Sequence, residues 1–449
     1  MKFRTTLILF GVFVVLLVFV VFFERTVTNV EEEDRFITLT SEDVETIIYK
    51  SEDQSITFQQ EEEGGWKITE PLEANADRFE VNRLVDDFSD ATIERVVEEE
   101  PDDLENYGIP RKELHFYPKN TEKSVTILIG MQNPLDNTFF AKREDETRVV
   151  LLSSSFKDLL DKNLFDFRQK NIFKFDTNDA ERIQLSSVQI QWKALKEGQE
   201  WFLQAPVEAL ANKSKISSIL VSLSNLKAIR FVSEEKNEAE MKTYGLDNPD
   251  VTVFLSFPGT DQPLILAINK IEDKAYATAS PSPKIIEIEA ALLSDLEATT
   301  EELREKKVST FFSWEINRLL IQSGELEMNV VKDKEGGWHL GSVTQDAADK
   351  EKIQTFIRKI EGLEAEEFID PPFVLEDYGL DSPQKRITIW EGDEENAREI
   401  TILIGSIDSE AEKTVVKNAG LDYLFRVDSS FLELFPKDTE AWKVKEEGD

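Results

Sequence analysis

The sequence contains one pattern three times, at intervals the size of a whole domain. A tryptophan that follows a glycine-containing turn occurs at Trp66, Trp201 and Trp338, with spacings of 135 and 137 residues. A Tyr-Gly pair follows each tryptophan, at Tyr107, Tyr244 and Tyr378, with spacings of 137 and 134 residues. Periods of about 20–50 residues indicate thin stacked units, whereas a domain typically has about 100–150 residues. The pattern therefore predicts three similar domains.

Each repeat begins with alternating apolar and polar residues, which is typical of half-buried strands. A helix is predicted next, because apolar residues recur at positions i, i+3, i+4 and i+7. These stripes are Val81, Leu84, Val85 and Phe88, then Ile216, Ile219, Leu220 and Leu223, then Ile353, Phe356, Ile357 and Ile360. More strands follow, and a closing helix is expected at 153–160, 289–296 and 428–435.

The predicted fold class is α+β, with three similar, mostly antiparallel sheet domains that each carry two helices. We expect these repeat domains at residues 31–178, 179–314 and 315–449, after an N-terminal segment of residues 1–30.

An uninterrupted apolar run extends from Leu7 to Phe23. As a helix it would measure about 26 Å, enough to cross most of a bilayer. A cleaved signal peptide is the alternative, but the run ends without the small residues that a cleavage site needs. Lys2 and Arg4 precede the run and an acidic segment follows it, so the positive-inside rule predicts a transmembrane anchor with a cytoplasmic N-terminus.

The chain is strongly acidic, with 90 Asp and Glu against 52 Lys and Arg and a formal net charge of −38. Such a body is repelled by nucleic acid and by anionic lipid headgroups, so neither is an expected partner. The acids favour a soluble exterior, with a surface for cations or a basic partner as the alternative. Cysteine is absent, so the fold uses neither disulfides nor thiolate chemistry.

Residues suited to catalysis are scarce. The two histidines, His115 and His339, occupy different positions of the repeat, and the sequence lacks the His-Glu-x-x-His, Gly-x-Ser-x-Gly and phosphate-loop motifs. We therefore predict no catalytic, cofactor-binding or metal-binding residue and no cofactor. An envelope hydrolase remains an alternative, because a pair of carboxylates is recognised only in space.

The six aromatic residues that mark the repeat are candidates for either binding or packing. Trp66, Trp201 and Trp338 could stack on sugars if exposed, or fill a core. The element Tyr-Gly-Leu-Asp-x-Pro, which contains Tyr244 and Tyr378, is interpreted as a turn, since glycine permits the left-handed conformation and proline stops a helix. A ligand loop is the alternative. The first repeat, at Tyr107, departs from this pattern because it lacks the aspartate.

Together these features resemble the bacterial family called domain of unknown function 4340. The best matches are the segment from Tyr244 to Pro249 and that from Tyr378 to Pro383, with Ile404-Gly405 after the second. The second repeat has Asn269 where this glycine is expected. The resemblance implies a single-pass protein of the bacterial inner membrane with its domains in the periplasm. It also implies an accessory role beside an ABC-type export system of the kind linked to gliding motility.

Two functions follow as hypotheses. The leading one is a non-enzymatic accessory or scaffold protein, anchored from Leu7 to Phe23, whose domains contact an ABC-type transporter or another envelope complex. The alternative is an extracytoplasmic module that binds glycan or peptide along repeated grooves. The alternative requires Trp66, Trp201 and Trp338 to face solvent.

Overall fold

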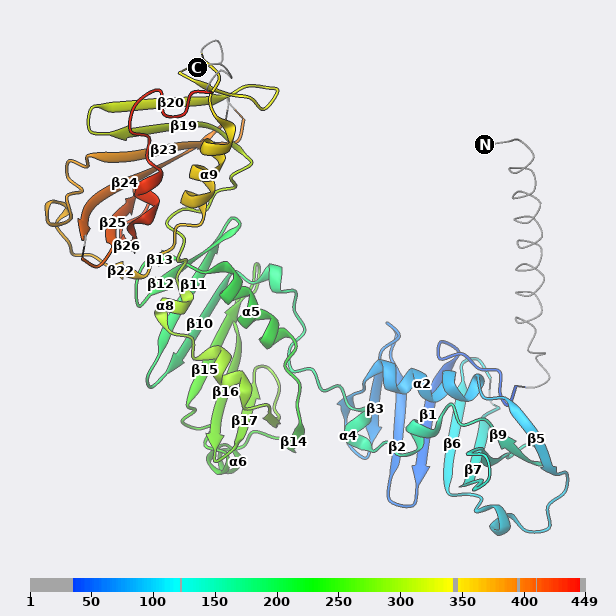
Figure 1. Cartoon of the computed structure of the whole chain (residues 1–449). Coiled ribbons are helices and arrows are strands. Elements are labelled where there is room, and N and C mark those ends of the chain that lie inside the picture. Colours follow the sequence, from blue (N-terminus) through cyan, green and yellow to red (C-terminus); the bar gives the residue numbers. More distant parts are fainter. Residues whose placement is uncertain (1–34, 122, 342–345, 394–395, 409, 445–449) are drawn as a thin grey trace, which may run out of the picture. The chain divides into compact units, whose positions relative to one another are not determined.

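The computed structural model describes residues 35–121, 123–341, 346–393, 396–408 and 410–444 (Figure 1). The chain divides into two compact units between Lys170 and Asn171. The first unit contains one β-sheet and the second contains two. The expected membrane helix from Leu7 to Phe23 lies outside the described residues. Within the described ranges, no helix has the length and apolar character needed to cross a bilayer.

Three large sheets share one strand order, and every strand pairing in them is antiparallel. The first sheet has the order β4-β3-β2-β1-β6-β7-β8-β9-β5 and the second β13-β12-β11-β10-β15-β16-β17-β18-β14. The third has the order β21-β20-β19-β23-β24-β25-β26-β22, and among the described residues it has no counterpart of the short edge strands β4 and β13. The predicted set of three similar, mostly antiparallel sheets is confirmed.

The strands of the first sheet are β1 (Val44–Ser51), β2 (Ser55–Gln60), β3 (Trp66–Glu70), β4 (Ala74–Asn75), β5 (Ile93–Glu98), β6 (Lys112–Pro118), β7 (Val125–Gln132), β8 (Phe139–Arg143) and β9 (Val149–Leu152). Those of the second are β10 (Arg182–Ser187), β11 (Gln191–Glu197), β12 (Glu200–Ala205), β13 (Ala209–Leu210), β14 (Arg230–Ser233), β15 (Val251–Ser256), β16 (Leu264–Ile271), β17 (Lys274–Ala279) and β18 (Ile285–Ile288). Those of the third are β19 (Ile316–Ser323), β20 (Leu326–Lys332), β21 (Trp338–Leu340), β22 (Glu367–Ile369), β23 (Lys385–Glu391), β24 (Arg398–Asp408), β25 (Lys413–Asn418) and β26 (Leu424–Asp428).

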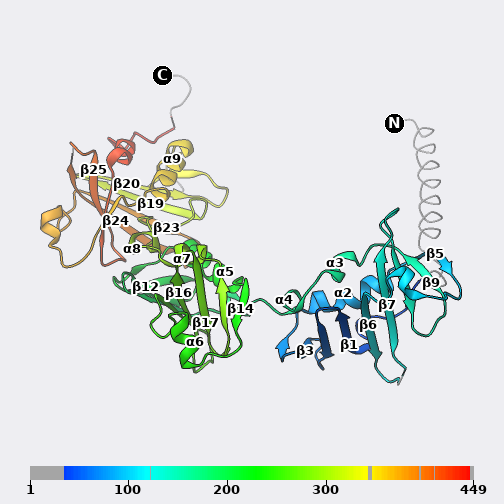
Figure 2. The same cartoon turned by 90° about the horizontal axis from the view of Figure 1, so that it is seen from below.

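One 12-residue helix lies across each sheet: α2 (Arg78–Ser89), α5 (Lys213–Ser224) and α9 (Lys350–Glu361) (Figures 1 and 2). Each is preceded by the short run of strands at one edge and followed by the strand at the opposite edge, so it must cross the sheet. Asp77, Asn212 and Asp349 cap the three helices by accepting hydrogen bonds from backbone amides of the first turn. All twelve residues of the predicted stripes are buried. At about 1.5–3 kcal/mol for each large apolar side chain, every stripe stabilises its domain by roughly 6–12 kcal/mol.

The closing helices are shorter than the sequence predicts. They are α3 (Lys157–Leu160), α7 (Ala291–Leu296) and a 3-10 helix at Ser429–Leu434. Three further short helices, α4 (Leu164–Phe167), α6 (Glu238–Thr243) and α8 (Thr300–Leu303), lie in the first two domains, so the count of two helices per domain is too simple. Several strands were not anticipated either. All four residues of β9 are buried, and such a strand has no alternation to detect.

The domains begin and end at repeated isolated bridges. At the start of each domain, one residue forms a bridge with the segment that follows the long helix of the same domain. These bridges are Arg35–Thr92, Asn171–Lys227 and Lys307–Glu364. Each domain ends at a second bridge, Ala76–Arg168, Ala211–Arg304 and Ala348–Lys443. Phe173 packs in the core of the second sheet, and Phe311 in that of the third. Residues 171–178 and 307–314, which the expected boundaries assign to the preceding domains, therefore pack with the sheet that follows.

A buried arginine joins the second and third sheets within the second unit. The Arg304 side chain is 3 % exposed, and its Nη1 donates a hydrogen bond of 3.0 Å to Asp370 Oδ2. Nη2 lies 2.9 Å from Oδ1 but is not aligned for a hydrogen bond, so this second contact is electrostatic. The guanidinium also stacks on Phe368, 3.8 Å from the ring centroid, and on Tyr423 at 4.6 Å. Since Leu210 donates its backbone amide to the Tyr423 hydroxyl, the joint combines charge, stacking and a backbone contact.

Replacing Arg304 with alanine is expected to loosen this joint without unfolding either sheet. Because the Asp370 side chain is 38 % exposed, solvent screens the ion pair, and its loss together with the stacking costs about 1–2 kcal/mol, or roughly a 5- to 30-fold more frequent local opening. Hydrogen exchange should therefore accelerate at the amides of Leu210 and Ala365, which bond across the joint. Arg182→Ala, at an exposed strand position in the same unit, is the control. Equal exchange in both variants contradicts the assignment.

Candidate functional site

The Tyr-Gly turns have the predicted conformation in all three domains. Gly108, Gly245 and Gly379 have φ values of +63°, +68° and +65°, in the left-handed region. Gly108 and Gly379 end the 3-10 helices Leu104–Tyr107 and Leu375–Tyr378, and Gly245 follows α6. These glycines end a helical turn and return the chain to the sheet, so the structural interpretation of the motif is supported.

The glycine expected downstream packs directly under the turn. A Cβ atom on Gly130 would approach the carbonyl oxygen of Tyr107 within 3.0 Å, and one on Gly405 would do the same at Tyr378. The second domain has a different solution, because the side-chain amide of Asn269 donates a hydrogen bond of 3.0 Å to the Tyr244 carbonyl. The close packing of a glycine against the tyrosine carbonyl in the first and third domains is thus replaced by a side-chain hydrogen bond to that carbonyl in the second.

The tyrosine rings of the first two domains pack alike, but the polar groups around the three rings differ. Tyr107 donates its hydroxyl to Glu98, and this hydrogen bond raises the pKa of the phenol. Tyr107 and Tyr244 pack against equivalent aromatic residues of β8 and β17, Phe140 and Tyr276, with 5.3 and 4.8 Å between ring centroids. Tyr378 lines a cavity of about 450 Å³ with charged residues of the third sheet. Tyr107, Tyr244 and Tyr378 are therefore equivalent in backbone role and do not form one repeated ligand site.

The repeated tryptophans belong to the cores. Trp66, Trp201 and Trp338 are 2 %, 3 % and 3 % exposed, respectively. Trp66 donates its indole N–H to Asn82 on α2 at 2.7 Å, which ties β3 to the crossing helix. No sugar can stack on rings buried in this way, so the alternative of repeated glycan-binding grooves loses its basis.

The histidines remain separate from each other and from the repeat. His115 contacts Thr126 and Glu113, each at 3.1 Å, on the surface of β6 and β7. His339 contacts Asp333 at 2.7 Å, and this hydrogen bond is the main reason that the pKa of the Asp333 carboxyl is lowered. Across the described ranges, no group of three or more His, Cys, Asp or Glu side chains is arranged to hold a metal ion.

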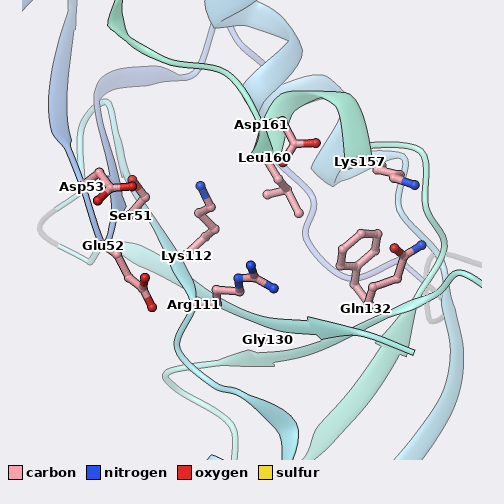
Figure 3. Close-up of a pocket in the computed structure, with 11 residues that line it drawn as sticks. Ser51, Glu52, Asp53, Arg111, Lys112, Gly130, Gln132, Lys157, Leu160 and Asp161 are labelled. Atoms are coloured by element: carbon pink, nitrogen blue, oxygen red, sulfur yellow. The ribbon is translucent and has the colours of Figure 1, made fainter. Parts of the chain in front are cut away.

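A polar cavity of about 240 Å³ lies in the first domain, where the β1–β2 turn meets β6, β7 and α3 (Figure 3). Figure 3 shows the side chains of Lys112, the first residue of β6, and of Arg111, directly before it, extending into the cavity. Its lining consists of Ser51, Glu52, Asp53, Arg111, Lys112, Gly130, Gln132, Phe139, Lys157, Leu160 and Asp161.

Hydrogen bonds fix the walls of this cavity. The Tyr49 hydroxyl donates to the Leu160 carbonyl at 2.8 Å, and the Gln54 amide donates to the Lys162 carbonyl at the same distance. Both connect the β1–β2 hairpin to the segment of α3. Burial, and secondly the Asp161 carboxylate, raises the pKa of the Tyr49 phenol, so Tyr49 remains a neutral donor.

The charges of the cavity indicate binding of a small polar group, without a catalytic pair. Three cations, Arg111, Lys112 and Lys157, line it together with the acids Glu52, Asp53 and Asp161. Neither histidine is among the lining residues, so Ser51 has no imidazole to act as its base there. A neutral site with both charges suits a zwitterionic or hydrogen-bonding group.

Sequence reasoning missed this cavity because its full set of cations does not repeat: Lys385 takes the place of Lys112 in the third domain, but Gln384 stands in place of Arg111. Lys112 pairs with Ser51 in the first sheet, and Val251 pairs with Ser187 at the equivalent place in the second. Arg111, which precedes Lys112, therefore corresponds to Asp250, which precedes Val251. The available indication was the basic pair Arg111-Lys112 directly after the Tyr-Gly turn, where the second domain has Asp250-Val251.

Replacing Tyr49 with phenylalanine should lower the free energy of unfolding by about 1–2 kcal/mol at pH 8, since the Leu160 carbonyl loses its buried donor. Because the pKa of Tyr49 is raised in the folded state, the stability that this phenol contributes is fully present below pH 10.0, the ordinary tyrosine pKa. That contribution is lost progressively as the pH rises above this value. Denaturant titrations at pH 8 and pH 11 should therefore show a smaller alkaline loss in Tyr49→Phe than in the parent chain. Tyr117→Phe, at a ring 40 % exposed, should match the parent.

Gly405→Ala should destabilise the third domain by about 1–3 kcal/mol, because the new Cβ would overlap the Tyr378 carbonyl oxygen. Gly420→Ala is the matched control in the same domain, since its Cβ would meet no atom closer than 3.5 Å. Thermal unfolding of both variants tests the difference. Equal melting temperatures would show that the Tyr-Gly turn tolerates a side chain beneath it.

Comparison with curated proteins gives no significant match. Among solved structures, the chain aligns with the β subunit of DNA polymerase III from Pseudomonas aeruginosa at 8 % identity, covering 85 % of this chain and 90 % of that one, with a TM-score of 0.18. A DNA polymerase sliding clamp from the same organism, solved with a ligand, aligns at 8 % identity over 87 % and 92 % of the two chains, with a TM-score of 0.15. Scores this low carry no argument about fold or function.

The family model described as "Domain of unknown function (DUF4340)" matches residues 66–249 and 201–374. The two segments begin at Trp66 and Trp201, the first two tryptophans of the repeat, and they overlap. Together they extend over well more than half of the sequence, and the expectation drawn from the Tyr-Gly motifs is confirmed. The chain belongs to the DUF4340 family.

Proposed function

We propose that this protein is a non-enzymatic accessory or scaffold subunit, tethered to the bacterial inner membrane from Leu7 to Phe23. Its three domains lie in the periplasm, where they contact a membrane-protein partner such as an ABC-type transporter or a related envelope complex. The apolar run supports the tether, and its flanking charges support this orientation.

The observation that carries the proposal is the kind of residue that repeats. The helix stripes and the three tryptophans are buried, and the repeated glycines serve the backbone. Polar side chains that could do chemistry differ between domains, as His115, His339 and the Arg111-Lys112 pair illustrate. Repetition of a shape with varied surfaces suits a scaffold, whereas an active site copied with the domains would repeat its reactive groups.

The charge distribution agrees with this role. At a net charge of −38, the domains are repelled by the anionic headgroups of the membrane that would tether them. Repulsion favours domains that project away from the bilayer and remain available for a protein partner. It also favours a partner with a basic surface.

The tagged full-length chain, recovered from native membranes after mild cross-linking, should carry along specific integral membrane proteins, including transporter subunits. Quantitative mass spectrometry against an untagged strain measures this enrichment. Recovery as a monomer alone would count against the scaffold role.

Two matched chains separate the contribution of the anchor from that of the domains. In one, an unrelated apolar segment replaces the residues from Leu7 to Phe23, and the partners should remain. In the other, the domains are exported without an anchor, and the yield of partners should fall because the two proteins are no longer confined to one membrane. Loss of all partners with the unrelated anchor would assign binding to the transmembrane segment.

A further inference from the structure

The third domain presents an exposed aromatic pair that its fold does not require. Phe312 and Trp314 are 53 % and 65 % exposed, and their rings stack with 4.7 Å between centroids and an interplanar angle of 26°. Isolated exposed apolar side chains are common, but two stacked aromatic rings in solvent leave a large apolar area uncovered. Trp314 is the only tryptophan in the exposed class, and all seven tryptophans lie in the described ranges.

Phe312 and Trp314 lie in a turn that precedes the third sheet, and the first two domains show what the fold requires at the equivalent turn. In each domain it lies two residues before a buried residue at the start of the sheet: Val44 of β1, Ala180 just before β10, or Ile316 of β19. The residue there is Glu42, Asn178 or Trp314. In all three its carbonyl accepts a hydrogen bond from a lysine ammonium, from Lys119 at 2.6 Å, Lys196 at 2.6 Å and Lys332 at 3.3 Å, respectively.

The structural role of this position is therefore carried by the main chain. The side chains of Glu42 and Asn178 are exposed and polar. The same holds two residues earlier, where Thr40 and Asp176 correspond to Phe312. Only the third domain places aromatic side chains at both positions, and folding alone does not explain them.

Hydrogen bonds to two carboxylates hold the backbone of the Phe312–Trp314 turn in place. The backbone amides of Phe312 and Ser313 donate to the carboxylates of Glu391 and Glu361, at 2.8 and 3.1 Å. Glu391 is buried and is itself paired with Arg398, whose guanidinium also donates to the Thr310 carbonyl. A surface ordered before binding loses little entropy on binding, and tryptophan is the residue most enriched among interface hot spots.

The charge around the turn selects the chemistry of the occupant. Glu315 is exposed next to Trp314, while Glu361 and Glu391 accept the Ser313 and Phe312 amides. The nearby cations are also engaged, Lys332 with the Trp314 carbonyl and Arg398 with Glu391. The whole chain adds a net charge of −38. An indole face within a negative field attracts a guanidinium or ammonium group.

We propose that the Phe312–Trp314 turn is a docking site for a basic segment of a partner protein, with an arginine or lysine of that segment stacked on Trp314. The site deepens the proposed scaffold role by naming the surface and the chemistry of the partner. Its test needs neither the native partner nor export to the periplasm, so the two proposals can fail separately.

The probe is a display library of random linear peptides, selected against the purified full-length chain in lipid nanodiscs. Selected peptides should contain arginine or lysine. Trp314→Asn and Phe312→Thr should each weaken their binding about tenfold or more, as measured by fluorescence polarisation. Both substitutions introduce residues already present at sister turns, and unchanged thermal unfolding verifies that the variants fold.

Val188→Asn is the matched control, because Val188 is 94 % exposed at a turn of the second domain. It should leave peptide binding unchanged. Selected peptides that lack a cation, or that bind Trp314→Asn as well as the parent, overturn the proposal, as does a library that yields no binder dependent on Trp314. A glycan panel is screened in parallel, and binding of sugars alone at Trp314 would also overturn it.

Discussion

The packing of one 12-residue helix across each sheet is the contact on which the rest of the structure depends. The chain reaches one edge of the sheet at β4, β13 or β21 and must resume at the opposite edge, in β5, β14 or β22. The helix spans that distance, and its four buried apolar residues close the core beneath it. The repeated tryptophan belongs to the same contact. In the first domain its indole is hydrogen-bonded directly to the helix, through Asn82. A domain built in this way needs no disulfide, and the chain contains no cysteine.

Triplication of this domain separates what the fold requires from what each copy has acquired. Where the three copies agree, the agreement is in buried side chains, left-handed glycines and backbone hydrogen bonds. Two of their differences lie on the surface: a cavity with three cations in the first domain, and a stacked aromatic turn in the third. The Tyr-Gly turn shows how local the exchange can be, since Asn269 replaces a glycine and still satisfies the same carbonyl. Comparison of copies within one chain thus identifies candidate binding surfaces.

The sequence predicted the sheets and crossing helices well because both have a period that reflects their burial. The stripe from Ile353 to Ile360 is one example, with all four apolar residues buried. It failed at β9, where every residue is buried and no period exists, and it gave no sign that Phe173 packs into the second core. The basic segment at Arg304 indicates a domain joint in the sequence, but its partners could not be recognised there, because Phe368, Asp370 and Tyr423 are distant in the chain. Trp314 could not be predicted from the repeat, because it has no counterpart in the other two domains.

The central claim, a scaffold that projects from the membrane into the periplasm, is tested most directly by the side of the inner membrane on which the domains lie. The chain has no cysteine, so Ser154→Cys, Val188→Cys and Val374→Cys each introduce a single thiol, one in each domain, at an exposed position. A maleimide that cannot cross the inner membrane, applied to cells with a permeabilised outer envelope, should label all three variants. Labelling only after the inner membrane is broken would place the domains in the cytoplasm and contradict the account.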